Sequence, residues 1–86
     1  MKRHTLSAQD VIDIFSRPFV IPLASCARSN RVQGEPVRKA LEHHLNLDGS
    51  SHPYYLVTST TDGLDYVNYK GGDQIKAVDA YNKIDV

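Results

Sequence analysis

The stretch from Leu23 to Leu45, LASCARSNRVQGEPVRKALEHHL, constrains the fold more than any other part of the chain. Small or apolar residues recur within it at five-residue intervals, at Ala27, Val32 and Val37. Two helices joined by a tight turn require a small side chain at their crossing, an apolar side chain under the corner and an apolar stripe on the second helix. The stretch therefore predicts a helix-turn-helix over about residues 22–47.

Length and composition limit the class of protein. The 86 residues allow one domain, and an apolar content of 41% is typical of a globular chain. No apolar run approaches the roughly 18 residues of a membrane span, and no apolar stretch follows the basic N-terminus, as a secretory signal requires. The single cysteine, Cys26, cannot form an internal disulfide, so we expect a reducing compartment and a cytoplasmic location without membrane contact.

Charge is unevenly distributed along a chain whose net charge is zero. Residues 1–44 hold seven Lys/Arg and four acids, whereas residues 45–86 hold three Lys and six Asp. The basic half contains the helix-turn-helix pattern, which favours a nucleic-acid contact there. Solvated surface charges without a target are the alternative, since DNA-binding domains usually have a larger positive excess.

The N-terminal segment has a clear helix start signal. Ser7 and Asp10 form an S-x-x-D capping box ahead of an apolar stripe. Pro18 ends this helix, because proline disfavours helical backbone at the residue before it. Phe19–Ile21 is a short apolar run between prolines, which predicts at most a brief edge strand.

The second half of the chain predicts a β-hairpin. Aromatic and β-branched residues flank a turn centred on Asp62-Gly63, which indicates a hairpin over about residues 54–70. With the turn at this position, Thr58 would pair with Val67, and Leu56 with Tyr69. The four side chains would share one face of the hairpin and cover the helices.

Asp73 predicts the start of a last helix over about residues 73–84, in which apolar residues fall at helical spacing. The predicted order is thus helix, short strand, helix, helix, hairpin, helix. We predict an α+β fold with one domain over residues 1–86. It is a winged helix-turn-helix with a three-helix core, a C-terminal β-hairpin wing and an extra C-terminal helix.

The run Glu35-Pro36-Val37-Arg38-Lys39-Ala40-Leu41 resembles the start of the recognition helix in winged helix regulators of the GntR type. In that family a P-V-R-x-A-L string follows an L-A helix and an apolar turn residue, a position that Val32 occupies here. The likeness covers roughly a quarter of the chain. It implies DNA-facing positions at Ser29, Arg31, Gln33, Arg38 and Lys39.

On this basis we expect a small non-enzymatic protein that binds duplex DNA, as a transcriptional regulator or accessory factor. The helix over residues 35–47 would enter the major groove, with the arginines of the turn on phosphates. A homodimer is expected, because one domain of this size binds DNA weakly. The predicted nucleic-acid-binding residues are Arg28, Ser29, Arg31, Gln33, Arg38, Lys39 and His43.

The five tyrosines of the second half favour a different class of function. Hairpin packing or a protein interface explains them more simply than stacking on bases. The neutral net charge and the acidic turn at Thr61-Asp62-Gly63 also suit a protein interaction module, an adaptor or inhibitor of an unknown larger enzyme. Its predicted interface, on the hairpin and C-terminal helix, is Tyr54, Tyr55, Tyr66, Tyr69 and Tyr81.

Catalysis and metal binding have little support in the sequence. It contains no phosphate loop, no nucleophile with a base that the sequence can place, and no carboxylate pair at a telling spacing. His43 and His44 would point about 100° apart on a helix, so one ion cannot easily take both. Cys26 is expected to be a small core residue. We therefore expect no enzymatic activity, no cofactor and no metal.

Overall fold

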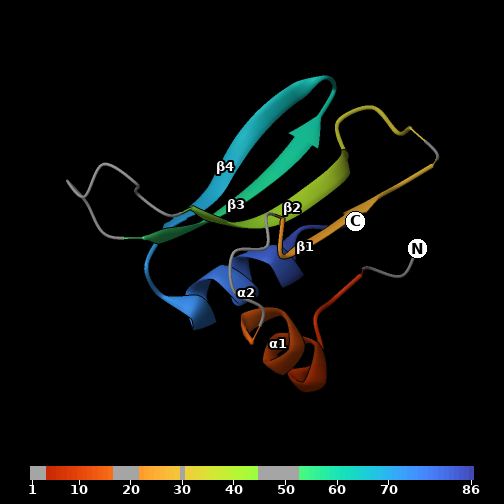
Figure 1. Ribbon diagram of the computed structural model, residues 1–86. Helices are drawn as coiled ribbons and strands as arrows, with labels where there is room; N and C mark the ends of the chain where they lie inside the picture. The colour runs from red at the N-terminus through yellow and green to blue at the C-terminus, as the bar shows by residue number, and fades with distance from the viewer. Residues whose placement is uncertain (1–3, 17–21, 30, 45–52) are drawn as a thin grey trace.

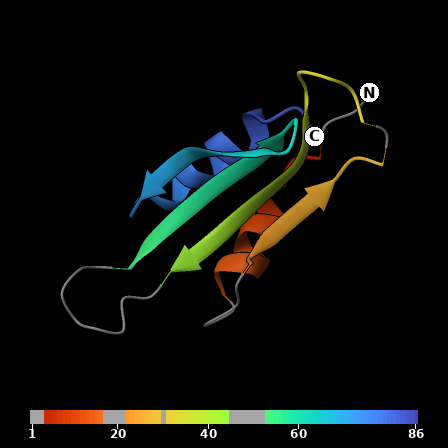
Figure 2. The same ribbon diagram turned by 90° about the horizontal axis from the view of Figure 1, so that it is seen from above.

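The computed structural model describes residues 4–16, 22–29, 31–44 and 53–86. Within them the elements are α1 (Ala8–Phe15), β1 (Ala24–Ala27), β2 (Pro36–His44), β3 (Tyr54–Thr61), β4 (Leu64–Gly71) and α2 (Gln74–Lys83). The strands form one antiparallel sheet in the order β1-β2-β3-β4. Both helices lie on the same side of it (Figure 1), and β1 and β4 are its two edges (Figure 2). The fold therefore has two layers, and no described element covers the second face of the sheet, here called the bare face.

The predicted winged helix-turn-helix with its three-helix core is wrong. Both segments expected to form the helices of the motif over residues 22–47 contain strands instead. These strands, β1 and β2, pair with each other. Val32, expected to be buried under the corner between two helices, is 44% exposed. The brief strand predicted at Phe19–Ile21 lies outside the described residues.

Strand β2 lies in the middle of the sheet and pairs on both sides. Leu41 is paired with Ala24 of β1 and with Val57 of β3. Its side chain and that of Lys39 face the helices and are buried, whereas Glu42 lies on the bare face. Pairing with two neighbouring strands satisfies the backbone of β2, and this tertiary pairing overrides the helical pattern of its sequence.

The hairpin and the last helix lie close to where the sequence predicts them. Asp62 and Gly63 have φ angles of 52° and 80°, the left-handed backbone that a tight two-residue hairpin turn requires. The Asp73 carboxylate accepts hydrogen bonds from the backbone N–H groups of Ile75 and Lys76, which caps the start of α2.

The predicted register of the hairpin holds near the turn and then shifts by one residue. Asn68 is skipped in the residue pairing with β3, although its side-chain amide donates to the Ser59 hydroxyl, so it is an extra residue in β4, which is a β-bulge. The prediction that all four paired side chains cover the helices is wrong. Tyr69 faces the helices together with Val57, whereas Leu56, Thr58 and Val67 lie on the bare face. The observed pairs are Thr58 with Val67, as predicted, then Val57 with Tyr69 and Leu56 with Lys70.

The core lies between the helices and the covered face of the sheet. The N-terminal segment is tied to the end of the chain, because the His4 N–H donates to the Val86 carbonyl at 2.7 Å. The Leu6 N–H also donates to Oδ1 of Asn82 at 2.7 Å. Neither helix within the described residues is long and apolar enough to cross a membrane. The buried core residues are Ile14, Leu23, Leu41, Val57, Ala77, Tyr81, Ile84 and Val86.

Candidate functional site

Lys39, predicted to contact DNA, is 1% exposed on the helix-facing side of β2. Its Nζ donates to the carbonyl oxygens of His4 at 2.5 Å, Tyr81 at 2.9 Å and Ile84 at 3.1 Å. It also lies 4.3 Å from the centre of the Tyr81 ring. An ammonium group has three donors, which these three carbonyls match. Lys39 thus joins β2 to the N-terminal segment and to the C-terminal end of α2.

Arg28, predicted to contact phosphates, is also held within the protein. Its Nη1 lies 2.6 Å from Oε2 of Glu35, and its Nη2 donates to the carbonyl of Asp85. The Arg28 side chain is only 6% exposed. Two of the predicted DNA-binding cations are therefore engaged by other parts of the chain.

The other residues predicted to bind nucleic acid lie in three different places. Ser29, Arg31 and Gln33 are exposed between β1 and β2. Arg38 is exposed on the bare face, and His43 is half-buried on the helix-facing side of the sheet. The structure thus does not bring the predicted set together on one surface.

The five tyrosines of the alternative interface are also dispersed. Tyr54 lies on the bare face, whereas the Tyr55 ring packs edge-to-face on Phe15, with 5.3 Å between ring centres. Tyr81 is buried in the core, and burial raises the pKa of its hydroxyl, which donates to Sγ of Cys26. Tyr66 and Tyr69 both lie on β4. Of the five, Tyr66 is the one that is largely exposed.

Cys26 does not lie on a helix as predicted. It is a half-buried residue of strand β1, and its side chain packs against the core cluster. Its neighbour across the sheet is Lys39 of β2.

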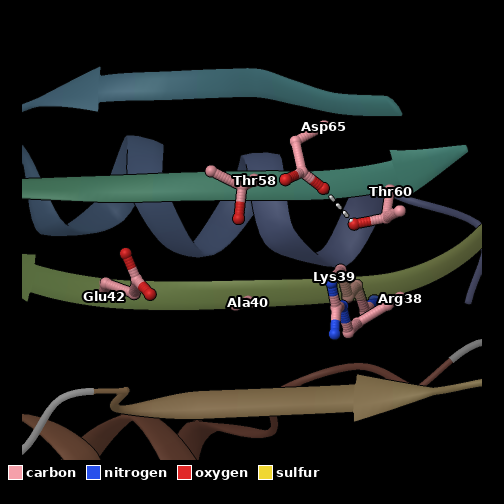
Figure 3. Close-up of a pocket in the computed structure, with 7 residues that line it drawn as sticks. All are labelled: Arg38, Lys39, Ala40, Glu42, Thr58, Thr60 and Asp65. Carbon is pink, nitrogen blue, oxygen red and sulfur yellow. Dashed lines mark hydrogen bonds between the residues drawn. The ribbon is translucent and has the colours of Figure 1, made fainter. Parts of the chain in front are cut away.

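The bare face has a shallow hollow of about 400 Å³ over β2 and β3. In Figure 3, Arg38 lies toward one end of this hollow and Glu42 toward the other, with Thr58 between them on β3. The Thr60 hydroxyl donates to Oδ1 of Asp65 at 2.5 Å. Two cations, Arg38 and Lys39, line the hollow against two carboxylates, Glu42 and Asp65, so it lacks the positive excess that a phosphate backbone requires.

A cluster of rings and charges occupies another part of the bare face. Nε2 of His44 lies 2.9 Å from Oε1 of Glu42, and the imidazole stacks on Tyr54 with ring centres 5.1 Å apart. Nζ of Lys70 lies 4.9 Å from the centre of the Tyr54 ring. These side chains pair with one another. Across the described ranges, no three His, Cys, Asp or Glu residues gather as a metal site would require.

The exposed large apolar side chains of the sheet are concentrated on β4. Leu64 is 60% exposed, Tyr66 49% and Val67 65%. β4 is eight residues long and pairs with β3 on one side, while no described strand pairs with its other side (Figure 2). Unpaired N–H and C=O groups at a sheet edge are a template for a further strand. The outer edge of β4 is therefore the candidate functional site.

The opposite edge of the sheet, β1, differs from β4 in length and side chains. It has four residues, and the two that are exposed are the small Ser25 and Ala27. Short edge strands are one means by which proteins avoid unwanted pairing. β4 has eight residues and exposes three large apolar side chains, and these differences single it out from β1.

Sequence reasoning found part of this site. It predicted the hairpin and named Tyr66 and Tyr69 in the alternative interface. It missed Leu64 and Val67. β4 is an edge strand because β3 pairs with β2 on its other side, and the sequence predicted a helix in place of β2. The apolar character of both hairpin faces was the available signal.

No family model, no curated protein and no solved structure matches this chain. The resemblance to GntR-type regulators therefore depends on the quarter of the chain that carries the motif, where the described residues include strands β1 and β2.

Proposed function

We propose that this chain is a protein interaction module that binds an extended strand of a partner along the outer edge of β4. The supporting observation is the exposure of Leu64, Tyr66 and Val67 on an unpaired edge strand. In such strand addition, main-chain hydrogen bonds supply affinity, and side chains at alternate positions supply specificity.

The side chains of β4 form two rows that a partner strand would meet. Leu64 and Tyr66 pair with residues of β3 that face the helices, so they point to that side of the sheet. Asp65, Val67 and Lys70 point to the bare face, because their partners in β3 do. A complementary strand would carry apolar or aromatic residues at its centre, with a basic group near Asp65 and an acidic group near Lys70.

Duplex DNA, the first function predicted from the sequence, has less support in the geometry. The segment expected to enter the major groove is strand β2, at the centre of the sheet. Lys39 and Arg28 are engaged by backbone carbonyls and by Glu35. Fluorescence anisotropy of a labelled random duplex at low and high salt tests this function directly. Binding that collapses as salt rises would favour DNA over the proposal made here.

Selection of peptides tests the proposed function. A library of random linear peptides, panned against the protein immobilised at a density too low for self-association, should yield β-prone sequences, because they add as a strand. Val67→Lys should weaken the binding of the selected peptides by about tenfold or more, since lysine on an edge strand opposes pairing. Ala27→Lys places the same charge on the β1 edge and should leave binding unchanged. Equal binding to both variants, or the absence of any selected peptide, would contradict the proposal.

A further inference from the structure

The side chains of β4 are complementary to a second β4 strand running in the opposite direction. We infer that the strand bound at this edge is β4 of a second copy of this chain. The two sheets would join into one continuous antiparallel sheet of eight strands around a two-fold axis at Val67. This inference rests on the proposed function and names the partner.

The bulge at Asn68 decides which side chains of β4 share a face. In an uninterrupted strand, Asp65 and Lys70 would point to opposite faces, because they are five positions apart. The extra residue changes this: Asp65 pairs with Thr60, and Lys70 pairs with Leu56. Thr60 and Leu56 are four positions apart in β3 and lie on the bare face, so Asp65 and Lys70 both lie there too.

Pairing about Val67 brings these opposite charges together. With Val67 opposite Val67 of the partner subunit, the bulge in each strand places Asp65 beside Lys70 of the partner subunit. The two-fold axis repeats this pair on the other side of Val67. Opposite charges across neighbouring strands stabilise pairing, whereas like charges oppose it.

The tyrosines on the other face of β4 are complementary in the same register. Tyr66 and Tyr69 pair with Ser59 and Val57, so both lie on the helix-facing side. The pairing that joins the charges places Tyr66 beside Tyr69 of the partner subunit. Aromatic pairs across strands are among the favourable ones, and the exposed ring of Tyr66 is accessible to such a partner.

The two-fold arrangement also closes the assembly. Pairing β4 with β1 of another copy would build an open chain of molecules, and β1 offers only four residues. Moving the two-fold axis to Tyr66 would place Asp65 opposite Val67 and leave Lys70 without an opposite charge. With the axis at Val67, Asp65 and Lys70 each lie opposite a residue of opposite charge.

Charge reversal at the proposed contact is the test. Sedimentation equilibrium over a range of protein concentrations should show wild-type dimers. Asp65→Lys and Lys70→Asp should each raise the dimer Kd by about tenfold or more, because each creates two pairs of like charge. The double variant D65K/K70D should return the Kd to near the wild-type value. Lys76→Asp, on the exposed side of α2, controls for the change in net charge and should have little effect.

The outcomes distinguish this inference from the proposed function. A monomeric wild type, or a double variant that stays as weak as the single ones, overturns the self-pairing of β4. If peptides selected as above still bind through β4 in that case, the proposed function stands without it. Circular dichroism of each variant separates a lost contact from a lost fold.

Discussion

The ammonium group of Lys39 holds three parts of the chain together. Its hydrogen-bond acceptors are the carbonyls of His4, near the N-terminus, and of Tyr81 and Ile84, at the end of α2. A cation near the C-terminal end of a helix also complements the partial negative charge there. Among the described residues, the other buried polar residue is Ser59, which is 7% exposed against 1% for Lys39.

We expect Lys39→Met to lower the free energy of unfolding by about 3 kcal/mol, because it leaves buried carbonyls without a donor. Arg38→Met is the matched control: its side chain is exposed, so the change should stay below about 0.5 kcal/mol. Chemical denaturation followed by circular dichroism measures both. Similar losses in the two variants would show that Lys39 is not an anchor.

The capping box of α1 makes stability depend on pH. The backbone N–H of Ser7 donates to Asp10, and this bond and the Ser7 hydroxyl lower the pKa of Asp10 below its ordinary value of 3.8. The ionised carboxylate is thus favoured in the folded state. Its contribution is fully present above pH 3.8 and is lost as pH falls through the lower pKa of the folded protein.

Asp10→Asn should therefore lower the melting temperature at neutral pH, and the difference from wild type should shrink in acid. Asp13→Asn removes a carboxylate from the same helix but leaves the capping box intact. Thermal melts of the three proteins at neutral and acidic pH check this. A difference between Asp10→Asn and wild type that is constant over pH would contradict the role of the charged form.

The burial of Lys39 could not be predicted from its sequence neighbours. A lysine is exposed by default, and its acceptors here come from residues 35 to 45 positions away. The capping box at Ser7 and Asp10 could be predicted, because its two partners are three residues apart and need no tertiary contact.

The turn between β3 and β4 sets the register at the start of the edge strand. Gly63 has a φ of 80°, where a Cβ is strained even though no atom lies within 4 Å of its position. We expect Gly63→Ala to lower the free energy of unfolding by about 1 kcal/mol. Gly72→Ala has equally open space and no positive φ, so it should cost less. Equal unfolding midpoints for the two variants would contradict this account of the turn.

The elements that sequence analysis located correctly are those with local signals. Asp62-Gly63 marks a hairpin turn and Asp73 marks a helix start without reference to the rest of the fold. β2 lacks such a signal, because Lys39 and His43 occupy helix-facing positions on either side of Leu41 and interrupt the apolar alternation. Pro36 ahead of this segment added a helix-like start. The long-range pairing with β3 then decided the outcome.

At the scale of the whole molecule, the described residues form surfaces of different character. The bare face is polar and mixed in charge, whereas the edge of β4 combines exposed apolar side chains with the charged Asp65 and Lys70. An apolar hollow of about 220 Å³ lies between the helices, beside Val11 and the exposed Ile75. Strand addition at β4 would leave the hollows of the bare face and of the helix layer open. Binding at the edge of β4, on the bare face and between the helices can therefore be distinguished in one experiment.

Amide hydrogen exchange of the protein with and without a selected peptide, at a concentration low enough to keep the chain monomeric, tests the central claim most directly, because it locates the bound strand. We predict that exchange slows in β4, over residues 64–71, and is unchanged in β1, over residues 24–27. Slower exchange confined to α1 and α2, or to β1, would show that the partner binds elsewhere and would contradict the assignment of β4 as the docking edge.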